Sequence, residues 1–96
     1  MTAYMVADVE WHDAAAVAKY REGHSELLAK YGGEILIGSS DVEVIEGTWK
    51  PRLLVIFKFP SRKAFHAWYR SAEYAPRLAL RRKHADSNVA LLGDYE

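Results

Sequence analysis

The chain has 96 residues, no cysteine, and 13 acidic side chains against 13 basic ones. This length predicts one domain over residues 1–96, and without cysteine there are no disulfides, thiolate nucleophiles or thiolate metal ligands. A net charge of zero disfavours nucleic-acid binding, and no apolar run approaches the ~20 residues of a membrane span. The first ten residues lack the basic flank of a signal peptide, so we expect a cytoplasmic protein with no membrane or nucleic-acid partner.

The charges are unevenly distributed along the chain. Residues 1–50 hold nine acids and four bases, whereas residues 51–96 hold nine bases and four acids. Most of the later bases fall within residues 61–84. There they either attract an anionic partner or form a solvated helix face that complements the acidic first half.

The first part of the chain predicts a strand followed by a helix. Residues 3–11, AYMVADVEW, alternate between two faces as a strand does. Asp13 is placed to cap a helix over residues 14–31, and Gly32-Gly33 ends it because glycine readily adopts the left-handed conformation. An apolar stripe at spacings of three and four runs along this helix. Its members are Val17, Tyr20, His24, Leu27, Leu28 and Tyr31.

The middle of the chain predicts two strands joined by a hairpin. The second strand begins at Glu34, has a bulge or kink over residues 38–41 and resumes over 42–45. Residues 46–51, EGTWKP, form the hairpin connection, with glycine supplying a positive φ. The third strand, residues 52–59, is apolar on both of its faces.

The last part predicts two offset helices and a final strand. Pro60 ends the third strand, and Ser61 caps a helix that carries Phe65, Trp68 and Tyr69 on one face. Ser71 is placed to cap a second helix, in which Pro76 marks either a bend or a fresh start. Residues 87–95, SNVALLGDY, predict the last strand, with an apolar run over 89–92.

The element order is β-α-β-β-α-β, which is the α+β, ferredoxin-like plan of a four-stranded antiparallel sheet with its helices on one face. The uncovered face of such a sheet is normally polar. Here the third and last strands are apolar on both faces, so a second copy of the sheet is expected to cover it. The sequence therefore predicts a homodimer that buries about 800 Å² per partner.

Several segments resemble a known family. They are the YGG after the first helix (31–33), the EGTWKPR hairpin (46–52), the FPS helix entry (59–61), the WYRSAEY run (68–74) and the later Arg81. The chain is similar over nearly its whole length to a small bacterial family catalogued as domain of unknown function 1330. That resemblance implies a dimeric α/β barrel, in which two ferredoxin-like sheets face each other.

The resemblance says little about activity. The wider superfamily includes cofactor-free monooxygenases, lactone isomerases, haem-using peroxidases and stress-response proteins, and the family itself has no settled activity. Members usually carry proline after the serine of the WYxS run, where this chain has Ala72. That departure loosens the start of the second helix, and Pro76 is placed to compensate.

Six aromatic and cationic residues are the candidate ligand-binding residues: Trp49, Arg52, Trp68, Tyr69, Tyr74 and Arg81. Tyr74 and Arg81 are seven residues apart, about two helical turns, and so share a helix face. Aromatic walls around one fixed cation suit a small planar or carboxylate-bearing ligand. The alternative is that the aromatic side chains pack the helices onto the sheet, while Arg81 secures a helix end or a dimer contact.

His24, Tyr74 and Arg81 are the candidate catalytic residues. His24 would be a general base with a pKa near the working pH, Tyr74 would donate a proton, and Arg81 would hold an anionic or enolic oxygen. A lone histidine on an apolar stripe is, however, more often a satisfied core residue. The four histidines show no metal-ligand spacing with one another or with carboxylates, so we expect no metal site and no cofactor.

Two functions remain. The first is a small dimer that binds an aromatic or carboxylate-bearing ligand in a cleft. If this dimer is an enzyme, its chemistry is cofactor-free and of the monooxygenase or isomerase kind. The alternative is a structural or stress-related homodimer without a ligand. Nucleophile-elbow, phosphate-loop and paired-carboxylate motifs do not occur in the sequence.

Overall fold

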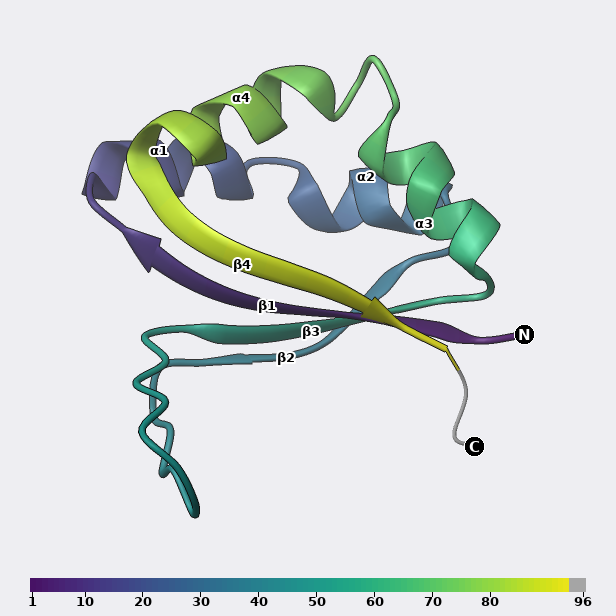
Figure 1. Cartoon of the computed structure of the whole chain (residues 1–96). Coiled ribbons are helices and arrows are strands. Elements are labelled where there is room, and N and C mark those ends of the chain that lie inside the picture. The colour runs from purple at the N-terminus through teal and green to yellow at the C-terminus, as the bar shows by residue number, and fades with distance from the viewer. Residues whose placement is uncertain (94–96) are drawn as a thin grey trace.

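The computed structural model describes residues 1–93. Its elements are β1 (Ala3–Trp11), α1 (Ala14–Arg21), α2 (His24–Lys30), β2 (Glu34–Ser39), β3 (Leu54–Phe59), α3 (Arg62–Tyr69), α4 (Ala75–His84) and β4 (Ala85–Leu92). The strands form one antiparallel sheet in the order β2-β3-β1-β4, and all four helices lie over one face of it (Figure 1). The predicted ferredoxin-like plan is confirmed, with each predicted helical region divided into two helices.

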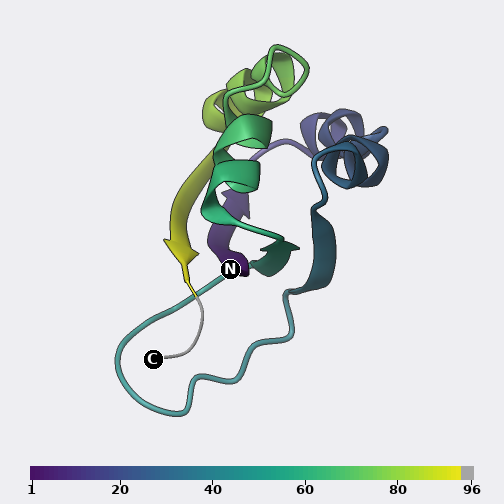
Figure 2. The same cartoon turned by 90° about the vertical axis from the view of Figure 1, so that its right-hand side faces the viewer.

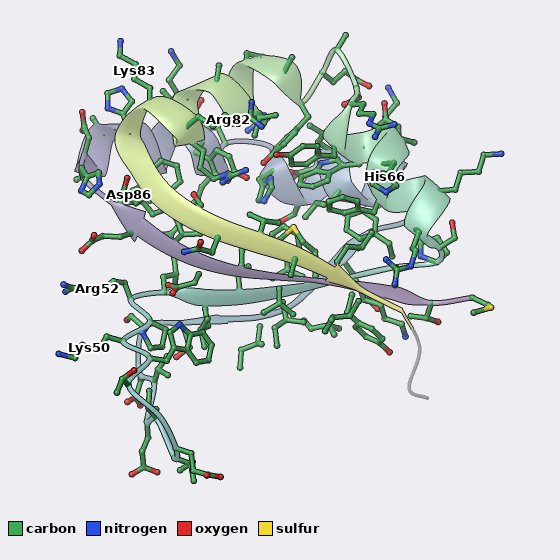
Figure 3. All side chains as sticks on the ribbon, in the orientation of Figure 1. Lys50, Arg52, His66, Arg82, Lys83 and Asp86 are labelled. Carbon is green, nitrogen blue, oxygen red and sulfur yellow. The ribbon has the colours of Figure 1, made fainter. Side chains whose placement is uncertain are left out.

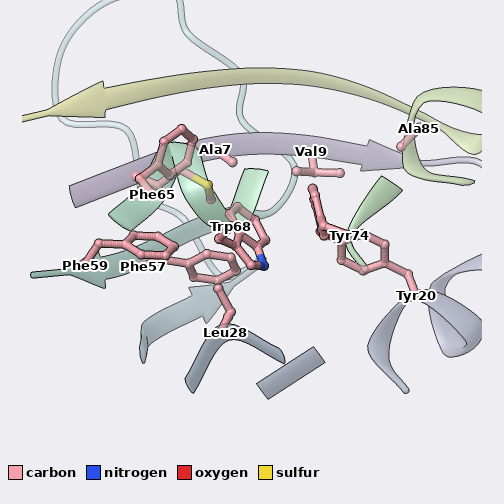
Figure 4. Close-up of a cluster of buried hydrophobic side chains, with 11 residues drawn as sticks. Ala7, Val9, Tyr20, Leu28, Phe57, Phe59, Phe65, Trp68, Tyr74 and Ala85 are labelled. Atoms are coloured by element: carbon pink, nitrogen blue, oxygen red, sulfur yellow. The ribbon is translucent and has the colours of Figure 1, made fainter. Parts of the chain in front are cut away.

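The core lies between the sheet and the helices. In β1 the alternating residues Ala3, Met5, Ala7 and Val9 are buried on the helix side, as their spacing predicts. The antiparallel register sets Met5 opposite Phe57 on β3. The helices contribute Leu28, Phe65 and Trp68 to the same buried cluster (Figure 4). Its rings meet at angles of 36–89°, which are typical of aromatic packing.

The predicted single helix over residues 14–31 is wrong, because the chain breaks at Gly23. Asp13 caps α1 as expected, accepting from the backbone N–H groups of Ala15 and Ala16 at 2.9 and 3.3 Å. Gly23 then takes a left-handed φ of 65°, which glycine adopts without steric cost, and α2 starts at His24. The break places His24 at a helix start, where the side chain is buried.

The predicted strand over residues 42–45 is also wrong. The irregularity in β2 falls between Ile35 and Ile37 rather than at 38–41, and the strand ends at Ser39. The chain from Ser40 to Leu53 is a long connection without helix or strand. It leaves the sheet on the side away from the helices (Figure 2).

In the second helical region, a new helix, α4, begins at Ala75, just before Pro76. Ser61 caps α3 by accepting from the Ala64 N–H at 3.0 Å. Ser71 stabilises the connection, since its hydroxyl donates to the Trp68 carbonyl at 2.8 Å and accepts from the Tyr74 N–H at 3.1 Å. Pro76 lies in the first turn of α4, where the missing N–H has no helical partner to lose. The final strand begins earlier than predicted, at Ala85, and the predicted residues 94–95 lie outside the described residues.

No helix among residues 1–93 is long and apolar enough to cross a membrane.

Gly33 provides a test of core packing. A Cβ added at Gly33 would lie 2.7 Å from Cε1 of Phe59, which is fully buried. We therefore expect Gly33→Ala to lower the free energy of unfolding by about 1–3 kcal/mol, as overpacking does. Gly38→Ala is the matched control, because the nearest atom to its added Cβ is 4.0 Å away on Val55. Urea denaturation of both variants measures the difference, and equal losses would contradict the close packing at Gly33.

Candidate functional site

A cavity of about 400 Å³ lies between the sheet and the helices. Its apolar wall comes from the helix-facing side chains of β1 and β3, including Met5, Ala7, Val55 and Phe57. Polar and aromatic side chains from the helical layer form the opposite wall. They are Tyr20, Arg21, His24, Ser25, Trp68, Tyr69, Tyr74 and Arg81. A volume in this range accommodates a small organic ligand.

The structure brings five of the seven predicted site residues to this cavity: His24, Trp68, Tyr69, Tyr74 and Arg81. It does not bring Trp49 and Arg52 there. The long β2–β3 connection carries both residues to the other face of the sheet, where Trp49 Nε1 donates to Asp8 Oδ2 at 3.1 Å. Arg52 pairs with Glu10 at 3.2 Å, and Figure 3 shows it well away from the helical layer. Residue spacing alone does not indicate how far this connection reaches.

Tyr20 on α1 completes the group, although the sequence reasoning did not single it out. Its hydroxyl lies 2.6 Å from the Tyr74 hydroxyl (Figure 4). Burial, followed by the neighbouring Tyr74 phenol, raises the pKa of Tyr20 well above its usual range. The Tyr20 phenol therefore stays protonated at neutral pH. The sequence signal that could have identified Tyr20 was its position in the apolar stripe, one helical turn before His24.

Arg81 on α4 is a buried cation to which no residue from 1 to 93 offers a carboxylate partner. It is only 7% exposed, and its Nη1 donates to Ser87 Oγ at 2.7 Å. Within residues 1–93, no acidic group lies within ion-pair distance of it. Burial disfavours its charge, but the Tyr74, Tyr20 and Tyr69 phenols more than offset this effect, so that the pKa of Arg81 is raised. A permanent positive charge therefore faces an aromatic cavity.

His24 is buried, but it is not the satisfied core residue that the alternative interpretation expected. Neither Nδ1 nor Nε2 has a hydrogen-bond partner within the described part of the chain. Its ring packs between those of Tyr20, at 4.8 Å between centroids, and Phe57, at 5.4 Å. Burial, followed by the charges of Arg77 and Arg81, lowers the pKa of His24 to about 4. The expectation of a pKa near the working pH is thus wrong for the protein without ligand, in which His24 is neutral.

Trp68 supplies the third buried nitrogen without a partner in residues 1–93, its indole Nε1. Its ring lies 4.1 Å from that of Tyr74, centroid to centroid. Buried polar atoms in folded proteins almost always have partners, and each exception calls for an explanation such as a catalytic role or a bound water or ion. In residues 1–93 the exceptions are three nitrogen atoms of His24 and Trp68, and both residues line the cavity. The arrangement offers apolar surface for a planar ring, the buried Arg81 cation and several hydrogen-bonding atoms.

The tyrosine pair supports a prediction on stability. Tyr20→Phe or Tyr74→Phe alone leaves one buried hydroxyl without its 2.6 Å partner, so each should lower the free energy of unfolding by about 1–2 kcal/mol. The double variant removes both hydroxyls and should cost less than the sum of the single losses. Chemical denaturation of the four proteins in this cycle measures the coupling. Additive losses would contradict a hydrogen bond between the two phenols.

A second cluster of polar side chains lies at the start of β4. The ligand-type atoms of Glu10, His12 and Asp86 all lie within 4.8 Å of one another, because the register sets Glu10 opposite Asp86. The sequence spacing did not reveal this group, since Asp86 is far away in the chain. These side chains already have partners: His12 contacts Asp86 at 3.1 Å, and Glu10 pairs with Arg52. Asp86 and His12 are exposed, and the cluster lies apart from the cavity.

The fold and the cavity together define a small ferredoxin-like α+β protein with a ligand-sized chamber between its helices and its sheet. Residues 2–95 match the model of a family described as domain of unknown function, DUF1330, and the chain belongs to that family. No curated protein matches the sequence closely enough to count as a relative.

Solved structures share the fold at low sequence identity. A protein of unknown function from Rhodopseudomonas palustris is 19% identical, with a TM-score of 0.79 over 99% of this chain and 83% of its own. SnoaB, a cofactor-independent oxygenase from Streptomyces nogalater, is 14% identical, with a TM-score of 0.67 over 99% of this chain and 94% of its own. A dimeric ferredoxin-like protein of unknown function from Thermobifida fusca is 16% identical, with a TM-score of 0.67 over 97% of this chain and 91% of its own. At such identities the likeness shows the fold alone.

Proposed function

We propose that this protein is a homodimer whose subunits each bind a small aromatic ligand with a carboxylate, phenolic or enolic oxygen in the helix–sheet cavity. The observation that carries the proposal is the set of polar groups in the cavity wall. Arg81 is buried without a carboxylate partner in residues 1–93, and three nitrogens of His24 and Trp68 lack partners there. A ligand oxygen bound at Arg81 would form a charge-assisted hydrogen bond in a site of low dielectric constant.

The shape of the cavity supports an aromatic ligand. The rings of Trp68, Tyr69 and Tyr74 lie close to one another at tilted or edge-on angles, and Phe57 belongs to the sheet-side wall. Stacked or edge-on aromatic contacts add about 0.5–1.5 kcal/mol each beyond simple burial. A planar ring is therefore the group that this wall would hold best.

The same residues suit cofactor-free chemistry on such a ligand. Arg81 would stabilise an anionic oxygen, Tyr74 would donate a proton through its hydroxyl, and His24 would accept one. In the protein without ligand, His24 is a weak base because its pKa is near 4. Catalysis would then depend on the ligand's own charge to make His24 more basic. The fold of SnoaB, described as a cofactor-independent oxygenase, is consistent with an activity of this class.

The sheet face without helices supports the homodimer. Across all four strands, the register sets Ile37 opposite Ile56, Ile56 opposite Val6, and Val6 opposite Ala90. This continuous apolar row lies on the face that the helices leave uncovered. Apolar faces of this kind usually mark an interface, and the Thermobifida fusca protein of the same fold is described as dimeric.

A charge in this row should break the dimer. We expect Ile56→Lys to convert the dimer into a monomer, because two buried ammonium groups would meet near the centre of the interface. Ala79→Lys, on an exposed position of α4, is the matched control and should stay dimeric. Sedimentation velocity at equal protein concentrations measures both. A dimer that survives Ile56→Lys would place the interface elsewhere.

Native mass spectrometry of the protein as purified tests the proposed function. We expect a dimer that carries extra mass, and we expect Arg81→Leu to lose that mass. A dimer that carries no mass beyond its two chains and binds no aromatic probe would support the alternative, a structural homodimer without ligand.

A further inference from the structure

We propose that the cavity takes up its anionic ligand together with a proton, and that His24 is the group that accepts the proton. This inference rests on the proposed binding of an aromatic ligand and adds the charge state in which the complex forms. The ligand class is thereby narrowed to aromatic acids that remain ionised near neutral pH. The complex gains one negative charge from the ligand and one positive charge from solvent, so its net charge is unchanged.

The position of His24 makes it the natural acceptor. Its two ring nitrogens have no partner in residues 1–93, so a proton on either nitrogen breaks no hydrogen bond within that part of the chain. The residue lines the same cavity as Arg81. The protonated ring would therefore have a donor available for a ligand oxygen in that cavity.

Among residues 1–93, the groups around His24 include no carboxylate and no second imidazole that would compete for the proton. From α1 it faces the Tyr20 ring, and from α4 the charges of Arg77 and Arg81. From β3 and α3 it meets Phe57 and Trp68, which do not titrate. Within the described residues, no carboxylate lines the cavity; its other titratable groups are phenols and arginines.

Electrostatics explains why ligand and proton would bind together. Burial and the two arginine charges lower the pKa of His24, so the ring is neutral before the ligand binds. An anion at Arg81 offsets one of these charges and also attracts a proton to the ring. Within about 5 Å, and at the effective dielectric constant of protein sites, this attraction is large enough to protonate His24 near pH 6. Affinity for an anion should then rise as the pH falls, whereas affinity for a neutral ligand should not.

Two fluorescent probes that differ by one charged group provide the test. They are 8-anilinonaphthalene-1-sulfonate and N-phenyl-1-naphthylamine, which has the same rings without the sulfonate. The sulfonate stays ionised throughout the pH range used. Arg81→Leu identifies the part of the signal that comes from the cavity. Arg82→Leu, an exposed neighbour on α4 (Figure 3), is the matched control.

We expect the affinity of the sulfonate probe to rise about fourfold between pH 7.5 and pH 5.5. The affinity of the neutral probe should stay constant. In His24→Gln, which keeps a polar side chain but cannot accept the proton, the sulfonate probe should bind with little dependence on pH. We also expect calorimetry of the unaltered protein, in two buffers of different ionisation enthalpy at pH 6.5, to show net proton uptake with the sulfonate probe. It should show none with the neutral probe.

The outcomes separate the two proposals. If both probes bind in the cavity and the sulfonate probe takes up no proton, coupled uptake is overturned while the proposed function stands. If neither probe binds in the cavity, the proposed function is overturned and the coupling falls with it. Should His24→Gln fail to fold, the calorimetric result on the unaltered protein still decides the question. Equal proton uptake by unaltered protein and His24→Gln would assign the proton to another group.

Discussion

Replacing Arg81 with leucine should weaken binding of an aromatic anion by about 10- to 100-fold while leaving the protein at least as stable as before. The loss of affinity follows from the loss of a charge-assisted hydrogen bond, worth about 1.5–3 kcal/mol. The retained stability follows from the surroundings of Arg81. It is buried, it donates a hydrogen bond to Ser87, and no carboxylate pairs with it in residues 1–93. Within those residues, no buried acid is therefore left unpaired when the guanidinium is removed.

This variant distinguishes a ligand-binding arginine from a structural one. Titrations with 8-anilinonaphthalene-1-sulfonate and its uncharged analogue measure affinity, and urea denaturation measures stability. The uncharged analogue should bind Arg81→Leu as well as it binds the unaltered protein. Arg82→Leu, the adjacent exposed residue, should change neither quantity appreciably. A marked loss of stability in Arg81→Leu with unchanged probe affinity would make Arg81 a structural residue.

Replacing His24 with leucine should stabilise the protein at pH 4.5 by about 2 kcal/mol more than it does at pH 7. The pKa of His24 is lowered from 6.5 to about 4 by folding. Between these values the unfolded chain binds a proton that the folded protein does not, so stability falls as the pH decreases from 6.5 to 4. Leucine cannot bind that proton, and the variant loses this part of the pH dependence.

The measurement is a set of denaturation curves for both proteins from pH 4 to pH 7.5, at one protein concentration. His66→Leu is the matched control for loss of an imidazole, because His66 is exposed on α3 (Figure 3). At pH 7, His24→Leu should leave the free energy of unfolding nearly unchanged or raise it, since the substitution removes two buried nitrogens without partners in residues 1–93. An identical pH dependence in the His24→Leu variant and the unaltered protein would show that His24 is not held neutral by its surroundings.

The ferredoxin-like architecture could be predicted because local signals and periodicity agree along most of the chain. The alternation of Ala3 to Val9 identified the buried face of β1, and Asp13 and Ser61 marked two helix starts correctly. The break at Gly23 was missed because glycine within a helical stripe is often tolerated, at a cost of about 1 kcal/mol. The bounds of β2 were missed because Val42 to Ile45 have high strand propensity, although they have no strand partner in the structure. Pairing between strands, unlike propensity, depends on distant parts of the chain.

The candidate site was predictable where its residues share one segment. Trp68, Tyr69, Tyr74 and Arg81 come from consecutive helices, and the structure brings them to one cavity. Trp49 and Arg52 were misplaced because a connection of unknown path separates them from those helices. The role of Tyr20 and the neutral state of His24 depend on three-dimensional proximity to Tyr74, Arg77 and Arg81. Sequence spacing carries no information about those contacts.

The central claim is that aromatic ligands bind between the helices and the sheet rather than on the open sheet face. The most direct test is the ¹⁵N–¹H spectrum of the three tryptophan indole groups during titration with N-phenyl-1-naphthylamine. The Trp68 Nε1–H lines the cavity without a partner in residues 1–93, whereas the Trp49 Nε1–H is bonded to Asp8 on the opposite face. We expect the Trp68 signal, assigned with Trp68→Phe, to shift with saturation while the Trp49 signal stays in place. A saturating shift of the Trp49 signal alone would contradict the cavity and place the binding site on the open face of the sheet.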